Sequence, residues 1–442
     1  MIQLPEKVKE IIIRLKEAGY EGYAVGGCVR DCILKRIPKD WDITTSAPPN
    51  QVKRIFKRTV DTGIEHGTVT VLLGEESFEV TTYRIDGEYE DARHPKEVTF
   101  TGNLTEDLRR RDFTINAMAY NEEQGLVDVF GGTEDLKKKI IRCVGNPQER
   151  FSEDALRMLR AIRFAAQLDF FIEQETYQAI SKMTDLMKKI SGERIQTELV
   201  KLLISSHPEK MKMIYETGLS RVILPEFDEM MQCQQNSKHH CYSVGEHTIC
   251  ALKEIKPDKV LRLTMLLHDI AKPECKTTDP DGTNHFKGHQ KRGAVVAYEL
   301  LKRLKFDNET IRRVTALVRW HDEKPELQDS EIRKAIYLAG TFCYPDLFAV
   351  KRADIYAQSL YRREDKLAYV SRYETIYNTI IQRKDCLSIG ELKINGRDLC
   401  GLGMKQGPEI GNLLCDLLKL VLEDTTKNTR ETLLNIVQNR MK

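Results

Sequence analysis

Two aspartates near the front of the chain have the type and spacing of metal ligands. Asp40 and Asp42 stand two positions apart at the start of a β-favouring run, residues 41–45. Side chains at positions i and i+2 of a strand point to the same side, so we expect the two carboxylates to converge. Carboxylate oxygens suit Mg²⁺, which keeps open positions for phosphate oxygens and can activate an attacking hydroxyl. Glu79, on a second predicted strand at 78–83, is a candidate third ligand.

A glycine pair stands shortly before these acids and is suited to hold a phosphate group. Gly26 and Gly27 let the backbone approach an anion, and the helix predicted after them offers its N-terminal N–H groups. Arg30 lies one turn into that helix, where its guanidinium could contact a triphosphate. An Asp-x-Asp or a Gly-Gly alone is a weak signal. Together at this spacing they indicate phosphoryl-type transfer, which needs mainly positioning and charge neutralisation.

A small mixed domain is predicted to position these residues. Its β-favouring runs, bounded by Gly, Pro and Asp, are residues 23–25, 41–45, 68–72 and 78–83. The helix predicted after Gly27 separates the first two runs. An earlier helix is predicted over 5–18, because Pro5 fits its first position and Gly19 fits just past its end.

The rest of the chain is predicted to be helical, since strand signals nearly vanish from about residue 134. We predict helices at 152–168, 193–205, 247–256, 259–271, 290–304, 309–320 and 409–422, with a Gly- and Pro-containing loop at 272–290. The expected fold class is α+β, with a sheet-containing head followed by an all-α neck, body and tail. We place these domains at 1–138, 139–225, 226–360 and 361–442.

Four further motifs follow the glycine pair and the two aspartates in order. They are 109–117 (RRRDFTINA), 153–157 (EDALR), 193–199 (ERIQTEL) and 389–398 (IGELKINGRD). With these motifs the chain resembles the nucleotidyltransferase superfamily, and specifically the bacterial-type CCA-adding enzymes and poly(A) polymerases. The likeness is continuous over about residues 20–225.

This resemblance implies the addition of nucleotides to an RNA 3′ end, with Mg²⁺ in a two-metal mechanism. The implied partners are tRNA, CTP and ATP. The resemblance suggests that Arg111 and Asp112 contact the incoming nucleotide, that 153–157 selects it, and that 193–199 supports the selecting segment. The body and tail would hold the acceptor stem by shape and backbone contacts, because A-form RNA hides the base edges of its major groove.

A carboxylate and a guanidinium can choose C and A without a template. Cytosine and adenine carry an amino donor beside a ring-nitrogen acceptor, whereas uracil and guanine present an acceptor oxygen beside an N–H donor. Asp154 can only accept and Arg157 can only donate, so the pair matches C and A and leaves unpaired groups against U and G. Each unpaired polar group in a closed site costs roughly 1–3 kcal/mol.

Two more arginines continue this row at intervals of three. Arg160 and Arg163 follow Arg157 on the helix predicted over 152–168. A row of this spacing drifts by about 60° per step on an ideal helix, so its four members cannot all touch one base. We assign Asp154 and Arg157 to the base edge, and Arg160 and Arg163 to phosphates or to the shape of the pocket.

Two observations favour CCA addition over other products. Residues 86–95 (DGEYEDARHP) resemble the flexible loop that CCA-adding relatives use when they switch from C to A, and relatives that add only CC look truncated there. The basic segment that marks bacterial poly(A) polymerases is not found, and residues 63–67 (GIEHG) stand in its place. CC addition and poly(A) addition stay open as alternatives.

A second set of metal-ligand residues lies between 240 and 355. His247, the adjacent His268 and Asp269, and Asp354 resemble the metal site of the HD phosphohydrolase domain. Mixed nitrogen and oxygen ligands suit a transition metal, whose bound water could act in hydrolysis. Three more histidines belong to the region, and two of them could extend the site to a second metal. The three are His285, His289 and His321, the first two being the candidates for that extension.

Composition sets the remaining expectations. The 442 residues carry a net charge of +2, which is compatible with RNA binding through local basic patches. We find no membrane helix and no secretory signal, and the eleven cysteines form no Cys-x-x-Cys pair, so we expect a cytoplasmic protein. No oligomeric state is predicted. The competing hypotheses are an HD phosphohydrolase with an inactive head and a non-catalytic RNA-binding protein.

Overall fold

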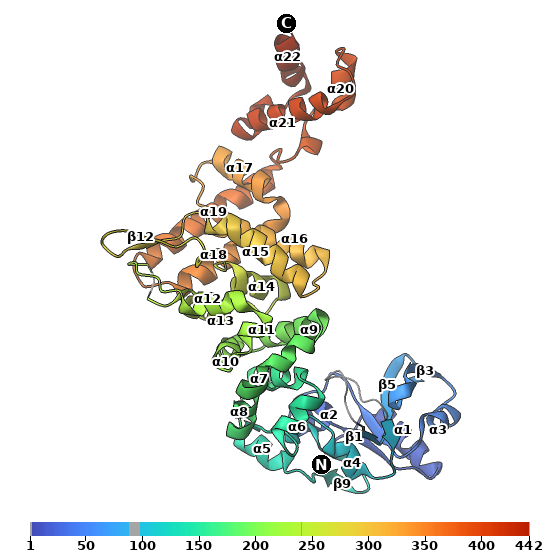
Figure 1. The fold of residues 1–442 in the computed structure, drawn as a ribbon. Coiled ribbons are helices and arrows are strands. Elements are labelled where there is room, and N and C mark those ends of the chain that lie inside the picture. Colours follow the sequence, from blue (N-terminus) through green and yellow to red (C-terminus); the bar gives the residue numbers. More distant parts are fainter. Residues whose placement is uncertain (1, 88–97, 240, 442) are drawn as a thin grey trace. The chain divides into compact units, whose positions relative to one another are not determined.

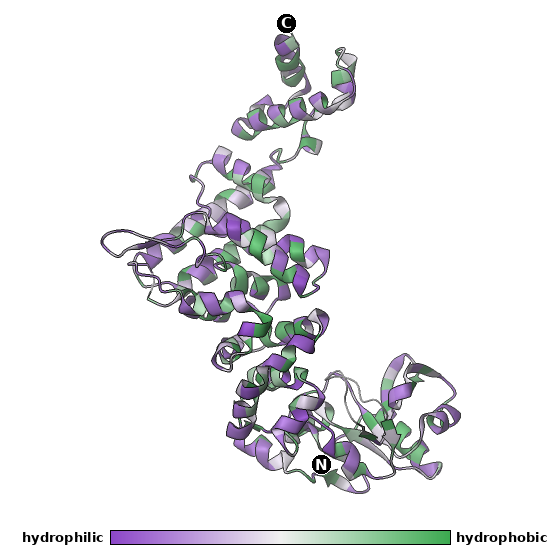
Figure 2. Ribbon diagram, in the orientation of Figure 1, coloured by the Kyte–Doolittle hydropathy of each residue, from purple (hydrophilic) through white to green (hydrophobic). Residues whose placement is uncertain are grey.

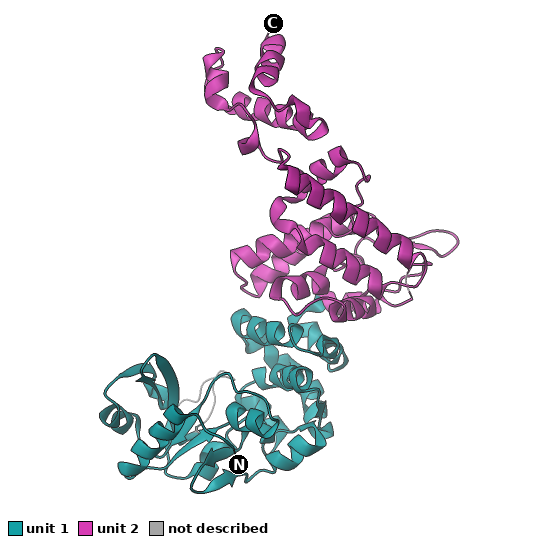
Figure 3. Ribbon diagram, turned by 180° about the vertical axis from the view of Figure 1, so that it is seen from behind, with its two compact units in different colours: residues 1–225 teal, residues 226–442 magenta. Residues whose placement is uncertain are grey.

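The chain folds into two compact units, Met1–Pro225 and Glu226–Lys442 (Figure 3). The computed structural model describes all residues except 1, 88–97, 240 and 442. Most of the loop at 86–95 therefore lies outside the described residues. The fold is α+β as predicted, with its large sheet in the first unit and mostly helices in the second (Figure 1).

A seven-stranded sheet forms the centre of the head. Its order is β3-β4-β5-β2-β1-β8-β9, and only the β2–β5 pairing is parallel. The strands are β1 Gly22–Val25, β2 Ile43–Thr45, β3 Thr59–Gly63, β4 Thr68–Leu73, β5 Glu76–Thr82, β8 Ala119–Asn121 and β9 Gly125–Val127. A separate pair is β6 Arg84–Asp86 with β7 Val98–Phe100. The four predicted runs correspond to β1, β2, β4 and β5.

Strand β5 shows the alternation of a strand that is buried on one face. Phe78 and Val80 are buried, whereas Glu79 between them is exposed on the opposite face. The apolar residues therefore face the core and leave the acid on the solvent side.

Before α5, the described part of the first unit contains four helices of six to twelve residues. They are α1 Glu6–Glu17, α2 Gly27–Ile33, α3 Pro49–Ile55 and α4 Leu104–Arg109. The prediction for α1 is one residue off at its start, because Pro5 precedes the first helical position instead of filling it. Gly19 follows the helix with a φ of 85°, in the left-handed region that favours glycine.

Helix α5, Gly132–Lys138, precedes the predicted neck. Its helices are α6 Pro147–Glu153, α7 Leu156–Leu168, α8 Gln174–Met183, α9 Gly192–Leu203, α10 Lys212–Glu216 and α11 Ser220–Ile223. A short parallel pair, β10 Ile140–Ile141 with β11 Phe171–Ile172, was not predicted.

The single helix predicted over 152–168 is wrong. Asp154 has an extended backbone with φ of −143° and separates α6 from α7. Its Oδ1 accepts a hydrogen bond of 3.1 Å from the Leu156 amide, so the side chain satisfies a backbone donor at the start of α7. Aspartate at a helix start commonly plays this part, which the apolar spacing alone did not reveal.

The second unit is helical. Its helices are α12 Pro225–Gln232, α13 Val244–Lys253, α14 Lys259–Leu267, α15 His289–Arg303, α16 Asn308–Trp320, α17 Asp329–Ala339, α18 Asp346–Ala357, α19 Arg363–Arg383, α20 Gly396–Gly401, α21 Pro408–Glu423 and α22 Arg430–Met441. Hydrophobic and hydrophilic residues alternate along these helices (Figure 2), as expected where each helix buries one side. The predicted loop at 272–290 contains a small hairpin, β12 Thr277–Thr278 with β13 Asn284–His285.

Helix α13 packs against both α14 and α18, and α14 packs against α16. Ser243 and Glu246 start α13 with a reciprocal capping box, which fixes the position of the first turn. Among the described residues, no helix is long and apolar enough to cross a membrane.

Candidate active site and histidine cluster

The two aspartates of the head lie in an irregular segment between α2 and β2. Asp42 still accepts a hydrogen bond of 3.0 Å from the Val25 amide through its backbone oxygen, but β2 begins at Ile43. Strand β1 ends at Val25, where the chain turns into Gly26, so Asp40 has no neighbouring strand to pair with. The i, i+2 strand argument is therefore wrong for this pair. Both residues are exposed.

Strand pairing and charge interactions indicate that Asp40, Asp42 and Glu79 lie near one another. Ile43 pairs with Val80, and Asp42 and Glu79 directly precede these two paired residues in the chain. Desolvation raises the pKa of Glu79 above its ordinary value, and the charges of Asp42 and Asp40 raise it further. Desolvation also raises the pKa of Asp42, where Arg111 opposes the effect and Asp40 adds to it. Hard oxygen ligands that repel one another fit a divalent cation.

The glycine turn brings arginines close to the backbone. Gly26 has a φ of 80°, and a Cβ at this position would lie 3.0 Å from Nη1 of Arg111. The Nε of Arg111 is buried without a hydrogen-bond partner, while its Nη2 lies 3.4 Å from Asp107. A side chain other than glycine would therefore displace a guanidinium that is electrostatically coupled to Asp42.

Arg30 is buried and bound within the protein. Its Nη1 donates to Oδ1 of Asn116 at 2.7 Å, and its Nε donates to Asp31 at 2.9 Å. The predicted contact between Arg30 and a triphosphate stays a prediction.

Asp112 forms an ion pair across the head and neck. Its Oδ2 accepts from Nε and Nη2 of Arg160 at 2.9 and 2.6 Å, and its Oδ1 accepts 3.1 Å from Asn116. Burial alone would raise the pKa of Asp112, but Arg160 outweighs it, and the pKa falls to about 2. The carboxylate is therefore held ionised. The predicted contact of Asp112 with the incoming nucleotide stays a prediction.

Asp154 and Arg157, the pair predicted to read the base, are held by other parts of the protein. Both oxygens of Asp154 accept from Arg194 on α9, at 3.1 and 2.7 Å. Arg157 donates 3.0 Å to the backbone oxygen of Arg110 and lies 2.5 Å from Glu153. These contacts fix the orientation of both groups, which a base-reading role requires.

Arg163 points into the protein interior. It pairs with Glu198 at 2.5 Å, and its guanidinium lies 3.6 Å from the centre of the Phe164 ring. The same ring has Arg30 at 5.2 Å and Arg160 at 5.5 Å. These contacts favour a pocket-shaping role for Arg163 over a phosphate contact.

Sequence reasoning missed Asn116, Glu198 and Phe164 as individual site residues. The motifs 109–117 and 193–199 contain the first two, and the spacing of Arg194 and Glu198 by four places both on one side of a helix. That spacing was the signal that could have identified Glu198.

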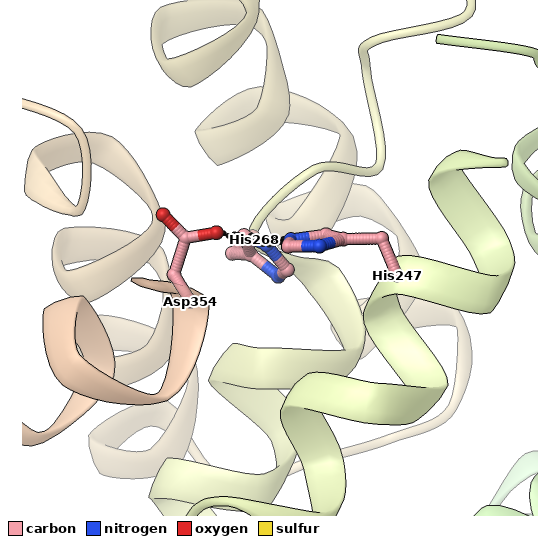
Figure 4. A group of neighbouring side chains, drawn as sticks. All are labelled: His247, His268 and Asp354. Atoms are coloured by element: carbon pink, nitrogen blue, oxygen red, sulfur yellow. Dashed lines mark hydrogen bonds and ion pairs between the residues drawn. The ribbon is translucent and has the colours of Figure 1, made fainter. Parts of the chain in front are cut away.

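The second unit gathers the predicted HD-type residues. His247 on α13, His268 just after α14 and Asp354 on α18 point toward one another (Figure 4). Nε2 of His247 lies 3.3 Å from Nε2 of His268 and 2.9 Å from Oδ1 of Asp354. Their ligand atoms all lie within 4.8 Å of one another.

A second group of three lies beside the first. Asp269, His289 and His321 also have ligand atoms within 4.8 Å of one another. Oδ1 of Asp269 is 3.4 Å from His289 and 3.7 Å from His321, while its Oδ2 is 3.2 Å from His268. The carboxylate of Asp269 therefore faces both groups. We call the two groups together the His/Asp cluster: His247, His268, Asp269, His289, His321 and Asp354.

His285 does not belong to the His/Asp cluster, contrary to the prediction that it could extend the site. Its ring is exposed and lies 2.7 Å from Asp279. Strand β13 ends at His285, and the chain reaches α15 only at His289.

The imidazole rings of the His/Asp cluster are oriented for ligation. The Nδ1 atom of each histidine lies near a backbone oxygen. His247 is 3.3 Å from that of Ala357, His268 is 2.8 Å from that of Met265, His289 is 2.8 Å from that of Phe286, and His321 is 2.8 Å from that of Val318. Donation from Nδ1 leaves the Nε2 lone pair available. Oδ2 of Asp269 is buried with no hydrogen bond of good geometry, although Nζ of Lys272 is 2.7 Å away. This donor set fits a transition metal, and two groups that share a carboxylate fit two ions.

The cluster opens onto a cavity of about 780 Å³. Asp269, His289, His321 and Asp354 line it together with Lys272. A small solute can therefore reach the buried ligands.

Three family models match the chain. Residues 22–142 match the poly(A) polymerase head domain, residues 169–231 the RNA and SrmB-binding site of polymerase A, and residues 293–437 the tRNA nucleotidyltransferase domain 2.

Curated relatives match over nearly the full length. The CCA-adding enzyme of Pediococcus pentosaceus is 36% identical over 438 residues, 99% of this chain and 98% of that protein. The CCA-adding enzyme of Levilactobacillus brevis is 36% identical over 433 residues, 98% of this chain and 97% of that protein.

Solved structures of the same kind of enzyme are similar in fold. The Bacillus stearothermophilus CCA-adding enzyme in complex with CTP is 27% identical, with a TM-score of 0.72 over 99% of this chain and 98% of that chain. The Thermotoga maritima CCA-adding enzyme complexed with tRNA is 22% identical, with a TM-score of 0.57 over 99% and 96% of the two chains.

Proposed function

Because the chain belongs to the family of CCA-adding enzymes, we propose that it adds CCA to the 3′ end of tRNA from CTP and ATP. The observation that carries this proposal is the identity of 36% over 98% of a CCA-adding relative. The acids of the head and the glycine turn beside them support it, because they provide what nucleotidyl transfer needs.

We propose that Asp40 and Asp42, with Glu79 beside them, hold divalent cations and that the ion is Mg²⁺. When bound, Mg²⁺ supplies charge neutralisation for the triphosphate and activation of the tRNA 3′ hydroxyl. The turn at Gly26 and Gly27 leaves room for the triphosphate close to the backbone.

The contacts of the neck support base selection by Asp154 and Arg157. We propose that Asp154 accepts from the amino group of C or A and that Arg157 donates to the ring nitrogen. Arg194 donates one hydrogen bond to each oxygen of Asp154 and so fixes the plane of the carboxylate. Arg111 and Asp112 would contact the nucleotide, and Arg160 would hold Asp112 in place.

The test is to supply a tRNA transcript that lacks CCA with all four NTPs and Mg²⁺, and to sequence the 3′ ends. We expect ends that stop at CCA. Ends that stop at CC, or runs of A, would replace the proposal by one of the alternative products, and the absence of any added nucleotide would refute it.

We propose that the His/Asp cluster gives the chain a second function, metal-dependent hydrolysis of a phosphate ester. Six buried or partly buried ligands with aligned Nε2 atoms favour it. A bound transition metal would supply Lewis acidity and activate water. Phosphate release from p-nitrophenyl phosphate should survive Asp40→Ala and be lost in Asp269→Ala. Release that is insensitive to Asp269→Ala would contradict this function.

Two further assignments complete the proposal. Residues 361–442 would contact the tRNA, which the family model over 293–437 supports. The protein would be cytoplasmic, since all eleven cysteines are free, as is usual in a reducing compartment.

A further inference from the structure

A group of basic side chains lines a cavity beside the His/Asp cluster. The cavity has a volume of about 260 Å³, and His321 and Asp354 form part of its lining. Lys324, Arg362 and Lys366 form another part, and we call these three residues the basic wall. Lys324 and Lys366 also line the larger cavity that contains Asp269 and His289. Cations therefore face the same space as the metal-ligand residues.

Lys366 is the member of the basic wall that is tied to the cluster. It is partly buried on α19, and its Nζ donates 2.7 Å to Oε1 of Gln358. Nε2 of Gln358 in turn donates 3.0 Å to Oδ2 of Asp354. This chain of hydrogen bonds fixes the Lys366 ammonium relative to a metal-ligand carboxylate.

Lys366 lacks the ion pair that its neighbours have. Lys324 lies 3.2 Å from Asp322, and Arg362 lies 2.9 Å from Asp365. Among the residues that the structure describes, no carboxylate lies within ion-pair distance of Lys366. An ammonium has three donors, and the hydrogen bond to Gln358 uses one of them.

The electrostatics show that the cations of the wall act on one another. Desolvation lowers the pKa of Lys366, Asp354 opposes this, and Lys324 and Arg362 lower the pKa further. Desolvation also lowers the pKa of His239 in the same cavity, with Lys366 as the next cause. Gathering like charges in a partly buried space is unfavourable, and a bound anion would relieve the repulsion.

The backbone next to the wall is held rigidly. Lys351 is buried on α18 and donates from Nζ to the backbone oxygens of His321 and Glu323, at 2.7 and 2.6 Å. These contacts fix the turn that leads from His321 to Lys324. The ligand His321 and the cation Lys324 are thus fixed by one turn.

We propose that Lys366, with Lys324 beside it, binds the phosphoryl oxygens of a terminal phosphate group whose phosphorus faces the His/Asp cluster. The inference rests on the proposed second function and narrows its substrate class to phosphomonoesters. A terminal phosphate carries close to two negative charges near pH 7, whereas a phosphodiester carries one. An ammonium that has no ion-pair partner among the described residues, with a second lysine beside it, matches the higher charge.

The first experiment measures binding without turnover. The full chain is loaded with Co²⁺, and its affinity for inorganic phosphate is measured by calorimetry for wild type, Lys366→Met and Lys366→Arg. Methionine removes the charge and keeps much of the length of the side chain. We expect phosphate to bind about 10-fold more weakly to Lys366→Met and to recover in part in Lys366→Arg. Lys302→Met is the control, because Lys302 is exposed and lines neither cavity.

The second experiment compares two substrates. We expect Lys366→Met to raise KM for p-nitrophenyl phosphate about 10-fold with a smaller change in kcat, and to change KM for bis(p-nitrophenyl) phosphate less. Far-UV circular dichroism and Co²⁺ absorption of each variant report whether the fold and the ligand set are intact.

The outcomes separate this inference from the second function. Hydrolysis that is lost in Asp269→Ala but has the same KM in Lys366→Met would overturn the inference and leave the function standing. Phosphate binding that depends on Lys366, in a protein that hydrolyses neither substrate, would overturn the function and support the inference. A wild-type protein that neither binds phosphate nor hydrolyses either substrate would overturn both.

Discussion

Asp40 and Asp42 lie exposed in an irregular segment, whereas His268 and Asp269 are almost fully buried at the end of α14. Among the described residues, the groups of three or more ligand side chains with atoms within 4.8 Å all belong to the His/Asp cluster. The acids of the head influence one another electrostatically without forming such a group. The protein alone therefore brings the ligands of the His/Asp cluster together, whereas it does not do so for the acids of the head.

The difference matches the chemistry proposed for each site. A site that takes in a nucleotide and releases pyrophosphate in every cycle benefits from open carboxylates, because Mg²⁺ usually keeps several ligands from water and phosphates. A hydrolytic site with a resident transition metal benefits from imidazoles that backbone oxygens hold in position. We therefore expect the head to exchange its metal freely and the His/Asp cluster to retain its metal.

The largest effect is expected at the acids of the head, Asp40 and Asp42. Asp42→Asn should lower CTP incorporation into tRNA by about 1,000-fold, on the scale of losing a main electrostatic contribution to the transition state. Incorporation is measured with labelled CTP, and the metal content of the His/Asp cluster should not change. Asp61→Asn is a control on an exposed acid of β3. A loss of less than 10-fold in Asp42→Asn would show that the acid is not a catalytic ligand.

The next largest effect is expected at the His/Asp cluster. His268→Ala should weaken transition-metal binding at the cluster by more than about 100-fold, since even residues outside the coordination sphere change affinity by 10- to 100-fold. Metal content after dialysis against a chelator measures this. His285→Ala provides the control, because that exposed histidine lies outside the cluster. Equal metal retention by His268→Ala and His285→Ala would contradict a metal site at the His/Asp cluster.

The comparison also shows which features sequence patterns can predict. The α+β class, strands β1, β2, β4 and β5 and most of the predicted helices follow from local periodicity. Strands β3, β8 and β9 were not predicted. Strands β8 and β9 have three residues each and, unlike β2, neither belongs to a longer predicted run. The break between α6 and α7 depends on one side chain, because Asp154 binds a backbone amide in place of continuing the helix.

Contacts between distant segments could not be predicted from spacing. Asp154 and Arg194 are 40 positions apart in sequence, and their ion pair depends on the packing of α9 against α7. Spacing likewise identified His268 and Asp269 as neighbours but not that Asp269 faces two groups of ligands. The second group depends on α15 and α16, which bring His289 and His321 close to Oδ1 of Asp269.

A smaller effect concerns nucleotide choice. Asp154→Ala should lower the preference for CTP over UTP by about 10-fold, within the roughly 1–3 kcal/mol cost of an unpaired polar group. Arg194→Ala should act in the same direction, because Asp154 would lose its fixed orientation. Sequencing of 3′ ends from mixed NTPs gives the ratio, with the exposed Asp185→Ala as control. An unchanged ratio in both variants would contradict the base-reading assignment.

The smallest effect is a pH dependence that only the head should show. The pKa values of Asp42 and Glu79 are raised, mainly by desolvation, and ionised carboxylates are the forms that bind a cation. Their protons therefore compete with Mg²⁺ as pH falls, and incorporation should decline at a pH above the ordinary carboxyl range of about 3.9–4.3. Raising the Mg²⁺ concentration should move this decline to lower pH, because the ion displaces the proton from the same oxygens. Initial rates at several pH values and two Mg²⁺ concentrations measure the shift. A decline whose midpoint ignores Mg²⁺ would have to come from a group that does not bind the ion, and the raised pKa values of these acids would then have no part in catalysis.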